Sequence, residues 1–571
     1  MIAFHGSSPT VLRKMSPITV LKVILFLELA FLANGASSNF KHYIVYMGEH
    51  SHPNSDSVMS ANHEMLASIT GRKLIGARFY NKGFEAEFGT LESHNATFSR
   101  SARDTDGHGS HTASTVGGSV VENVSMNGIA RGTARGGVPN ARLAIYKACW
   151  FNQCGDADIL SAIEDAIEDG VDILSLSVGP SPPQPSFFSD SISISTYHAF
   201  RKGILSSASA GNDRLPRTAT NVAPWILTVA ASSIDRDFDS NVHLGNSKMF
   251  KGFSLNPLKM KKYSRIVNAT IAAAPGVPLK NARNPVAKIL PTATILNAKP
   301  APRMAVFSSI GPNIITPDII KPDITAPGVN ILAAWPPIAT TATAERSVDY
   351  NIISGTSMSC PHASAVAAII KSCHPSWSPS AIQSAMMTTA TVIDNTGRTI
   401  VKDPFRSPTT PFNYGSGHIN PTAAVDPGLI YEYDSNDIID FLCSTGAGPK
   451  NLKNLTGEQL TCKKHPTPSY NLNYPSIGVS NMKGHVSVLR TVTYYGQGPT
   501  TYAPNVEKPE GVEVAVKPNT LVFRKTGEKQ SFKIDFIPYK TSNGNFVFGS
   551  LTWSNGIHRV RSPIALNVIS I

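Results

Sequence analysis

The stretch Ser354-Gly355-Thr356-Ser357-Met358-Ser359-Cys360-Pro361-His362 decides how the rest of this 571-residue chain is interpreted. An alanine-rich run follows at 363–370, and a proline ahead of such a run is typical of the first turn of a helix, where its missing N–H costs nothing. We therefore expect Ser357 at a helix N-terminus, where free N–H groups and the helix dipole favour a developing negative charge. That position suits a nucleophilic serine, although a serine there can also be only an N-cap.

Two stretches upstream contain further groups suited to catalysis. In Asp104-Thr105-Asp106-Gly107-His108-Gly109, glycines on both sides of His108 allow close backbone approach and leave one ring edge open, as a general base requires. In Ser207-Ala208-Ser209-Ala210-Gly211-Asn212, small residues end in an amide that can stabilise an oxyanion. Each also has an ordinary structural explanation: a loop histidine beside a capping aspartate, and a Gly-Asn turn after a strand.

Together, in this order, the three stretches resemble the plant subtilases, a branch of the subtilisin-like serine proteases whose serine motif is G-T-S-M-S/A-C-P-H. The resemblance implies that His108 is the general base, Asn212 the oxyanion donor and Ser357 the nucleophile. It also implies a substrate pocket with two walls, the first formed by Ser175, Leu176, Ser177, Val178 and Gly179, and the second by Ser209, Ala210 and Gly211.

Two other hydrolase classes fail on local residues. The sequence Gly355-Thr356-Ser357-Met358-Ser359 lacks the second glycine of an α/β-hydrolase elbow. The sequence His63-Glu64-Met65-Leu66-Ala67 has alanine where a zinc-protease motif needs its second histidine. We expect neither a metal nor another cofactor.

The third member of a serine-protease triad has no counterpart in the sequence. In subtilisins an aspartate precedes the histidine, and the resemblance implies that it follows a central strand of the sheet. The only aspartates before His108 are Asp56, which has no apolar strand before it, and Asp104 and Asp106, which are better explained as helix caps. The family pattern breaks off at Gly71-Arg72, so we expect the aspartate strand to be missing and the sheet to be left open there.

The fold class expected is α/β, a subtilisin-like parallel sheet flanked by helices. A strand, a helix and a strand at 141–147, 156–169 and 171–178 predict a right-handed crossover. Alternating apolar residues from about 470 predict a β-sandwich. The expected domains are a signal peptide at 1–35, a truncated inhibitor-type propeptide at 36–71, the peptidase domain at 72–430 with a remnant of a protease-associated insert at 235–302, a linker at 431–469 and a fibronectin type III-like domain at 470–571.

Several features indicate a secreted protein of the extracellular space or cell wall. Lys22 precedes an apolar run at 23–33 that is too short to span a membrane. Six cysteines fit an oxidising compartment: Cys149 with Cys154 and Cys443 with Cys462 are candidate disulfides, whereas a helix between Cys360 and Cys373 can hold that pair apart. Candidate glycosylation sites are Asn95, Asn123, Asn268 and Asn454.

The leading prediction is a secreted serine endopeptidase whose partners are protein or peptide substrates and its own propeptide, an intramolecular chaperone and inhibitor truncated here. The net charge of +12 is spread along the chain and does not predict a nucleic-acid site. Two alternatives remain open: a catalytically inactive homologue that serves as a peptide-binding scaffold, and a truncated gene model of a complete enzyme.

Overall fold

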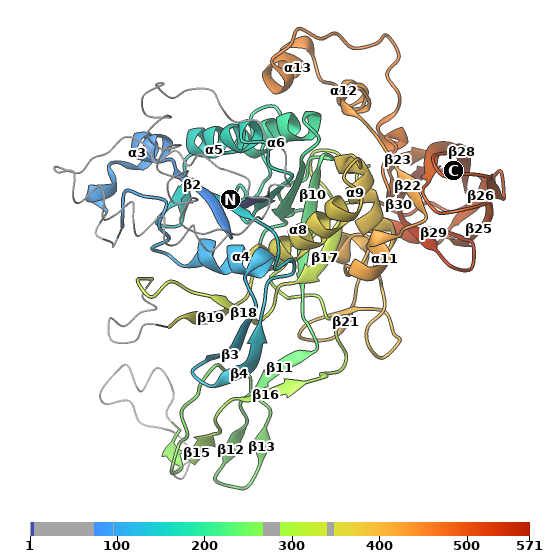
Figure 1. The fold of residues 1–571 in the computed structure, drawn as a ribbon. Helices are drawn as coiled ribbons and strands as arrows, with labels where there is room; N and C mark the ends of the chain where they lie inside the picture. Colours follow the sequence, from blue (N-terminus) through green and yellow to red (C-terminus); the bar gives the residue numbers. More distant parts are fainter. Residues whose placement is uncertain (1, 5–72, 95, 97, 267–285, 340–347) are drawn as a thin grey trace, which may run out of the picture.

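The computed structural model describes residues 2–4, 73–94, 96, 98–266, 286–339 and 348–571 (Figure 1). The predicted signal-peptide cleavage region and propeptide therefore lie outside the described residues. The central sheet has seven strands in the order β17-β10-β9-β8-β1-β5-β2. From one edge to the other they are Ile324–Pro327, Ile226–Ser232, Leu205–Ser209, Ile173–Leu176, Ile2–Phe4, Leu143–Lys147 and Leu74–Phe79.

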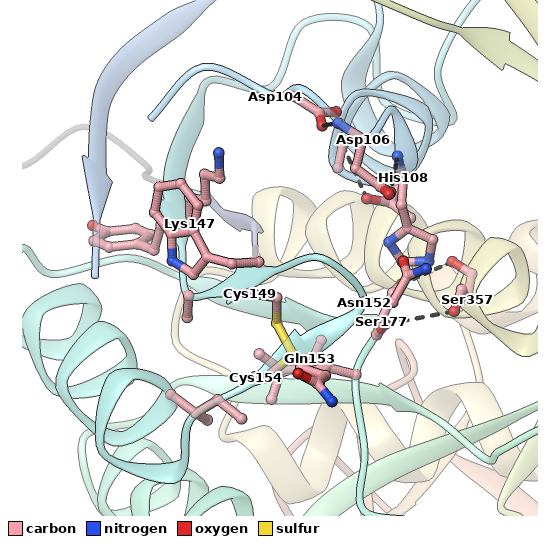
Figure 2. Close-up of a pocket in the computed structure, with 18 of the residues that line it drawn as sticks. Asp104, Asp106, His108, Lys147, Cys149, Asn152, Gln153, Cys154, Ser177 and Ser357 are labelled. Carbon is pink, nitrogen blue, oxygen red and sulfur yellow. Dashed lines mark hydrogen bonds between the residues drawn. A yellow bond between two sulfur atoms is a disulfide. The ribbon is translucent and has the colours of Figure 1, made fainter. Parts of the chain in front are cut away.

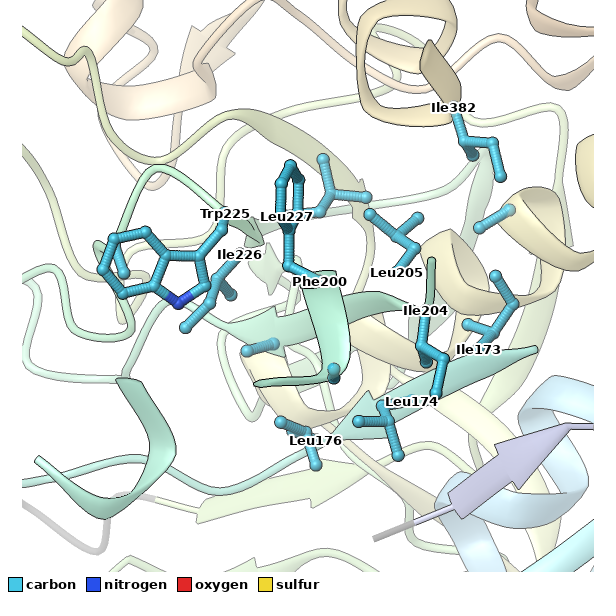
Figure 3. Close-up of a cluster of buried hydrophobic side chains, with 14 of the residues drawn as sticks. Ile173, Leu174, Leu176, Phe200, Ile204, Leu205, Trp225, Ile226, Leu227 and Ile382 are labelled. Carbon is cyan, nitrogen blue, oxygen red and sulfur yellow. The ribbon is translucent and has the colours of Figure 1, made fainter. Parts of the chain in front are cut away.

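Helices cover both faces of this sheet and bury its apolar side chains (Figure 1). The helices that pack on the sheet include α4 (His108–Gly117), α5 (Asp156–Glu168), α6 (Ser191–Arg201), α8 (Thr356–Cys373) and α9 (Pro379–Thr388). Figure 3 shows side chains of β8, β9 and β10 packed with Phe200 and Ile382 from the helices. Residues of β8 are buried on both faces, as expected for a parallel sheet between two helical layers.

The middle position of the sheet differs from the expectation of an open gap. Strand β1, at the start of the chain, pairs antiparallel with both β5 and β8, so that Ala3 lies opposite Ala144 on one side and Leu174 on the other. All the other strand pairs of this sheet are parallel. Residues 2–4 belong to the segment assigned above to a signal peptide, and three residues with no alternation of their own gave no sign of a strand.

A small β-rich region lies beside the main sheet and includes the predicted remnant of an insert. Hairpins and short sheets are formed by β3 (Val121–Met126) with β4 (Ile129–Ala134), β11 (Arg236–Asp239) with β16 (Ala293–Leu296), β12 (Val242–Leu244) with β13 (Met249–Phe250) and β15 (Val286–Ile289), β14 (Ser264–Arg265) with β15, β18 (Ile331–Ala334) with β19 (Tyr350–Ile353), and β20 (Val401–Lys402) with β21 (Ser407–Pro408). The remaining short elements before the C-terminal part are α3 (Lys82–Phe88), η1 (Leu91–Ser93), β6 (Cys149–Trp150), β7 (Gln153–Cys154), α10 (Pro411–Tyr414) and α11 (Pro421–Val425).

The C-terminal part is a sandwich of two mainly antiparallel sheets around its own apolar core. One sheet has the order β22-β24-β28-β26 and the other β23-β30-β29-β25-β27. In chain order the strands are Leu429–Tyr431, Ile477–Lys483, Val486–Tyr494, Thr500–Glu507, Val512–Lys517, Leu521–Phe523, Lys529–Pro538, Val547–Ser554 and Arg559–Ser570. Strand β22 thus lies across the boundary predicted between the peptidase domain and the linker, because three apolar residues are too few to show alternation.

The predicted linker at 431–469 contains regular structure. It forms α12 (Ser435–Ser444) and α13 (Pro449–Thr456), and η2 (Ser469–Asn471) follows before the sandwich. The backbone carbonyl of Leu455 in α13 lies 2.9 Å from Nε2 of His198 in α6. The segment is therefore packed against the peptidase part.

Candidate active site

His108, Asn212 and Ser357 line one cleft, together with residues at the carboxyl ends of β5, β8 and β9. Figure 2 shows His108 and Ser357 in this cleft. His108 begins α4, Asn212 follows β9 and Ser357 is the second residue of α8. Parallel strands end at one edge of a sheet, which is where ligands of open α/β folds bind. The three residues predicted to carry the chemistry are thus brought together from positions up to 249 residues apart in the sequence.

Helix α8 begins earlier than predicted, at Thr356, so Pro361 lies inside the helix and not in its first turn. A proline there has no N–H to donate to the carbonyl four residues back, which is that of Ser357. The hydroxyl of Ser177 donates to this carbonyl instead, at 2.7 Å. The first turn therefore keeps its hydrogen bonding, and the backbone N–H of Ser357 stays at the positive end of the helix.

The backbone before His108 explains the first of the two glycines that flank it. Gly107 has φ +104°, and a Cβ on it would lie 2.3 Å from a ring carbon of Trp335. Glycine is therefore required both by the backbone conformation and by the close approach of the indole. Burial lowers the pKa of His108 from its ordinary value of 6.5, while the carboxylates of Asp106 and Asp104 act in the opposite direction. The ring is thus neutral at pH 7, as a general base must be.

The two aspartates before His108 bind the backbone of the first turn of α4. Asp104 accepts hydrogen bonds from the N–H groups of Asp106, Gly107 and Ser110, and Asp106 accepts from the N–H of His108. These are the contacts expected of carboxylates at a helix N-terminus. Within the part of the chain that the structure describes, no carboxylate forms a hydrogen bond with the His108 ring.

The amide of Asn212 is held in one orientation by Thr356. Its Oδ1 accepts from the backbone N–H of Thr356 and from the Thr356 hydroxyl, both at 3.0 Å. A backbone N–H can only donate, so the atom that faces it must be the amide oxygen and Nδ2 lies on the other side. Asn212 is exposed to the cleft, which leaves Nδ2 available to an oxyanion.

Most residues of the predicted substrate pocket line the cleft. Ser175, Leu176, Ser177, Val178 and Gly179 line the cleft from one side, and Ser209 and Gly211 from the other. Ala210 is fully buried and is not among the lining residues. The residue is therefore part of the core behind its wall, because side chains alternate along an extended chain.

Two contacts that orient the proposed catalytic groups, those of Thr356 and Ser177, were not predicted from the sequence. The contact of Thr356 with Asn212 could have been anticipated, because Thr356 stands between Gly355 and Ser357 in the serine motif. The hydroxyl of Ser177 donates to the carbonyl of Ser357, which is 180 residues away in the sequence. No local sequence pattern indicates such a contact.

The cysteines and sequons are placed as follows. Disulfides join Cys149 to Cys154 and Cys443 to Cys462, with Cα–Cα distances of 4.2 and 5.5 Å. Cys360 is a buried free thiol and Cys373 an exposed one, at opposite ends of the helix between them. Of the four candidate glycosylation sites, Asn123 and Asn454 are exposed, while Asn95 and Asn268 lie outside the described residues.

Comparison with known families identifies both folded parts. The subtilase family model matches residues 55–417, and a fibronectin type III domain model matches residues 471–566. No helix in the described part of the chain is long and apolar enough to cross a bilayer.

Curated relatives agree over most of the chain. It is 47% identical to the subtilisin-like serine-protease S of Lotus japonicus, covering 96% of this chain and 99% of that protein. It is 40% identical to the Arabidopsis thaliana subtilisin-like protease SBT5.3, covering 87% of this chain and 75% of that protein. It is 39% identical to the CO(2)-response secreted protease of Arabidopsis thaliana, covering 88% of this chain and 76% of that protein.

The first of these alignments spans 756 positions, more than the 571 residues of this chain, so that relative has segments with no counterpart here. Among solved structures, the prenylagaramide maturation protease PagA matches with 18% identity and a TM-score of 0.34, over 56% of this chain and 82% of that one, and is too distant to bear on the fold. The family match and the near full-length relative are sufficient: the chain belongs to the subtilase family of serine-type endopeptidases.

Proposed function

We propose that this protein is a secreted endopeptidase of the extracellular space or cell wall that cleaves peptide bonds through Ser357 and His108. The observation that carries the proposal is the fixed amide of Asn212, whose oxygen is taken up by Thr356 and whose Nδ2 is directed to the cleft that Ser357 lines. An oriented donor beside a nucleophile at a helix N-terminus is the arrangement that acyl transfer needs.

The residues support the following steps. The Ser357 oxygen attacks the peptide carbonyl carbon while His108 takes the hydroxyl proton. The oxyanion accepts hydrogen bonds from Asn212 Nδ2 and the Ser357 N–H. Collapse breaks the C–N bond, the leaving amine takes the proton from His108, and water then hydrolyses the acyl-enzyme by the same steps in reverse. No cofactor takes part.

Turnover by this chain is expected to be slow, because no carboxylate orients the His108 ring within the described residues. In a related subtilisin, loss of the triad aspartate alone lowers turnover by roughly 10⁴. We propose a loss of turnover of the same order for this chain. The lack of such a carboxylate among the described residues also supports the alternative of a truncated gene model whose full version includes a further strand, consistent with a relative that has additional segments.

The test is hydrolysis of a panel of fluorogenic peptides by the secreted protein, compared with Ser357→Ala and Asn212→Ala. We expect slow cleavage that Ser357→Ala abolishes. Asn212→Ala should lower kcat by about 10²–10³, the loss known for one oxyanion donor in a subtilisin. Cleavage that survives Ser357→Ala would contradict the proposal.

A second candidate is a peptide-binding scaffold without turnover, which is favoured because no described carboxylate forms a hydrogen bond with the His108 ring. The scaffold would bind peptides in the cleft with the same affinity before and after Ser357→Ala, and would cleave none. A third reading, a truncated gene model, is tested by sequencing the messenger RNA across codons 71 and 72. A transcript that encodes an additional strand ending in aspartate would support it, and a junction as in the present sequence would not.

The remaining expectations belong to the same proposal. Secretion of an Arabidopsis relative is stated in its name, and we infer the same compartment here. The segment at 36–71 is proposed to serve as a shortened intramolecular chaperone and inhibitor. Glycans are proposed at the exposed Asn123 and Asn454, and also at Asn95 and Asn268.

A further inference from the structure

One fully buried amide joins the two walls of the substrate pocket. The side chain of Asn221 has 0% exposure. Its Nδ2 donates to the carbonyl of Val178 at 2.9 Å and to the carbonyl of Ser209 at 2.8 Å. Val178 belongs to the first wall and Ser209 to the second. A primary amide has two N–H donors, and Asn221 uses one for each wall.

The position of Asn221 is itself fixed by further hydrogen bonds. Its backbone N–H donates to Oε1 of Gln184 at 2.6 Å, and its carbonyl accepts from the hydroxyl of Thr228 at 2.6 Å. Its φ of +58° is the left-handed conformation that asparagine adopts more readily than most residues. Little freedom is left for this side chain, so the two carbonyls it holds are fixed as well.

The walls approach Asn221 so closely that larger residues do not fit. A Cβ on Gly179 would lie 2.7 Å from Nδ2 of Asn221 and 3.2 Å from Oγ1 of Thr220, a cleft-lining residue. The first wall therefore packs directly against the Asn221 amide, so a change of that side chain should alter the distance between the two walls.

We propose that Asn221 is a positioning residue that sets the width of the substrate pocket and thereby selects the side chain beside the scissile bond. The inference deepens the proposed function and rests on it. Asn221 itself is not a lining residue of the cleft, so its effect on substrate choice is exerted through the carbonyls of Val178 and Ser209.

A matched control is available in Asn313, which is also fully buried. Its Nδ2 donates to the carbonyl of Val222 at 3.1 Å and to the hydroxyl of Thr316 at 3.0 Å, and neither residue lines the cleft. Truncation of either asparagine leaves two buried acceptors without a donor, so both variants lose stability. Only the Asn221 variant should change substrate choice.

The experiment measures binding in a Ser357→Ala background, so that it does not depend on turnover. Two labelled peptides, identical except for Ala or Phe before the scissile bond, are titrated into Ser357→Ala alone and with Asn221→Ala or Asn313→Ala. We expect Asn221→Ala to change the ratio of the two Kd values by at least about tenfold, the scale of discrimination by pocket size. Asn313→Ala should leave that ratio unchanged.

Gly179→Ala gives an independent second variant, since its Cβ displaces the same amide from the opposite side. It should also change the ratio. The inference is overturned if neither Asn221→Ala nor Gly179→Ala changes the ratio in folded protein, if Asn313→Ala changes it equally, or if neither peptide binds. Failure of the proposed function is a different result, namely no cleavage by the unmodified protein, while peptide selection can still be measured.

Discussion

The first turn of α8 depends on a hydrogen bond to the carbonyl oxygen of Ser357. Pro361 removes the helical donor for this carbonyl, and the hydroxyl of Ser177 replaces it at 2.7 Å. Ser177 thus has two roles, because it also lines the pocket. Ser357, the proposed nucleophile, is thus positioned partly by a residue of the proposed substrate pocket.

Ser177→Ala should therefore leave the Ser357 carbonyl without its donor. We expect a loss of about 0.5–1.5 kcal/mol in the free energy of unfolding and slower reaction of Ser357 with a fluorophosphonate. Ser207→Ala is the control, since the Ser207 hydroxyl donates to the carbonyl of Cys360 in the same helix, away from the nucleophile. Equal reaction rates in the two variants would contradict the role given to Ser177.

The pH dependence of activity follows from the burial of His108. Burial disfavours the charged ring and lowers its pKa below 6.5, so the base form persists into mildly acidic solution. The acid limb of kcat/KM against pH reports this group in the free enzyme, and we expect its midpoint below pH 6.5. A midpoint above pH 7 would mean that a carboxylate stabilises the charged ring.

At this scale the sequence points to the proposed reactive groups but not to the residues that position them. His108, Asn212 and Ser357 are found because each stands in a short, chemically unusual motif. Ser177 and Asn221 act through contacts with residues far away in the sequence, and both lie in ordinary strand or loop patterns. Ala210 was assigned to the pocket by the family resemblance, whereas its side chain is fully buried behind the wall.

Strand β1 is the element on which the sheet depends most. It is short, yet it pairs on both sides, and without it the facing edges of β5 and β8 would have no partner among the described strands. An unpaired edge in the middle of a sheet leaves buried N–H and C=O groups unsatisfied, which is costly.

Ala3→Pro should consequently destabilise the protein. Proline removes one ladder donor and does not fit a central strand, so we expect a loss of at least about 2 kcal/mol, measured by urea unfolding. Met249→Pro, in the exposed edge strand β13, is the control and should cost much less. An unchanged unfolding midpoint for Ala3→Pro would show that the folded protein does not use residues 2–4 as its central strand.

Elements were predictable where they were long and periodic. The stretches at 141–147, 156–169 and 171–178 correspond to β5, α5 and β8 with small shifts of their ends. The residues at 221–231 also favour a strand by their pattern, but β10 begins only at Ile226, because Asn221 has a positive φ and Pro224 has no N–H to pair. Strands β1 and β22 have three residues each, too few to show a period.

The two domains are held together by a buried polar network. Lys321 and Asp323, both fully buried, form an ion pair of 2.6 Å between Nζ and Oδ2. Tyr474, just before the sandwich, donates to the other oxygen of Asp323 at 2.5 Å. A second contact packs the ring of Phe412 edge-on against Phe546 and Phe548 of the sandwich side. The sandwich is therefore part of one folded unit with the peptidase domain.

Lys321→Met should destabilise the whole molecule, because it leaves the Asp323 carboxylate buried without its counter-charge. A loss of about 3–5 kcal/mol is expected for breaking one partner of a buried pair, measured as the free energy of unfolding. Lys508→Met removes an exposed ion pair with Glu513 and should cost no more than about 1 kcal/mol. Comparable losses in the two variants would contradict the importance of the buried pair.

The measurement that tests the central claim most directly is labelling of the folded, secreted protein by a fluorophosphonate, followed by mapping of the modified residue. We predict a single adduct on Ser357 that is absent from Ser357→Ala and forms more slowly in His108→Ala. Absence of any adduct on protein shown to be folded, or an adduct on another serine, would contradict the assignment of Ser357 as the nucleophile of a peptidase.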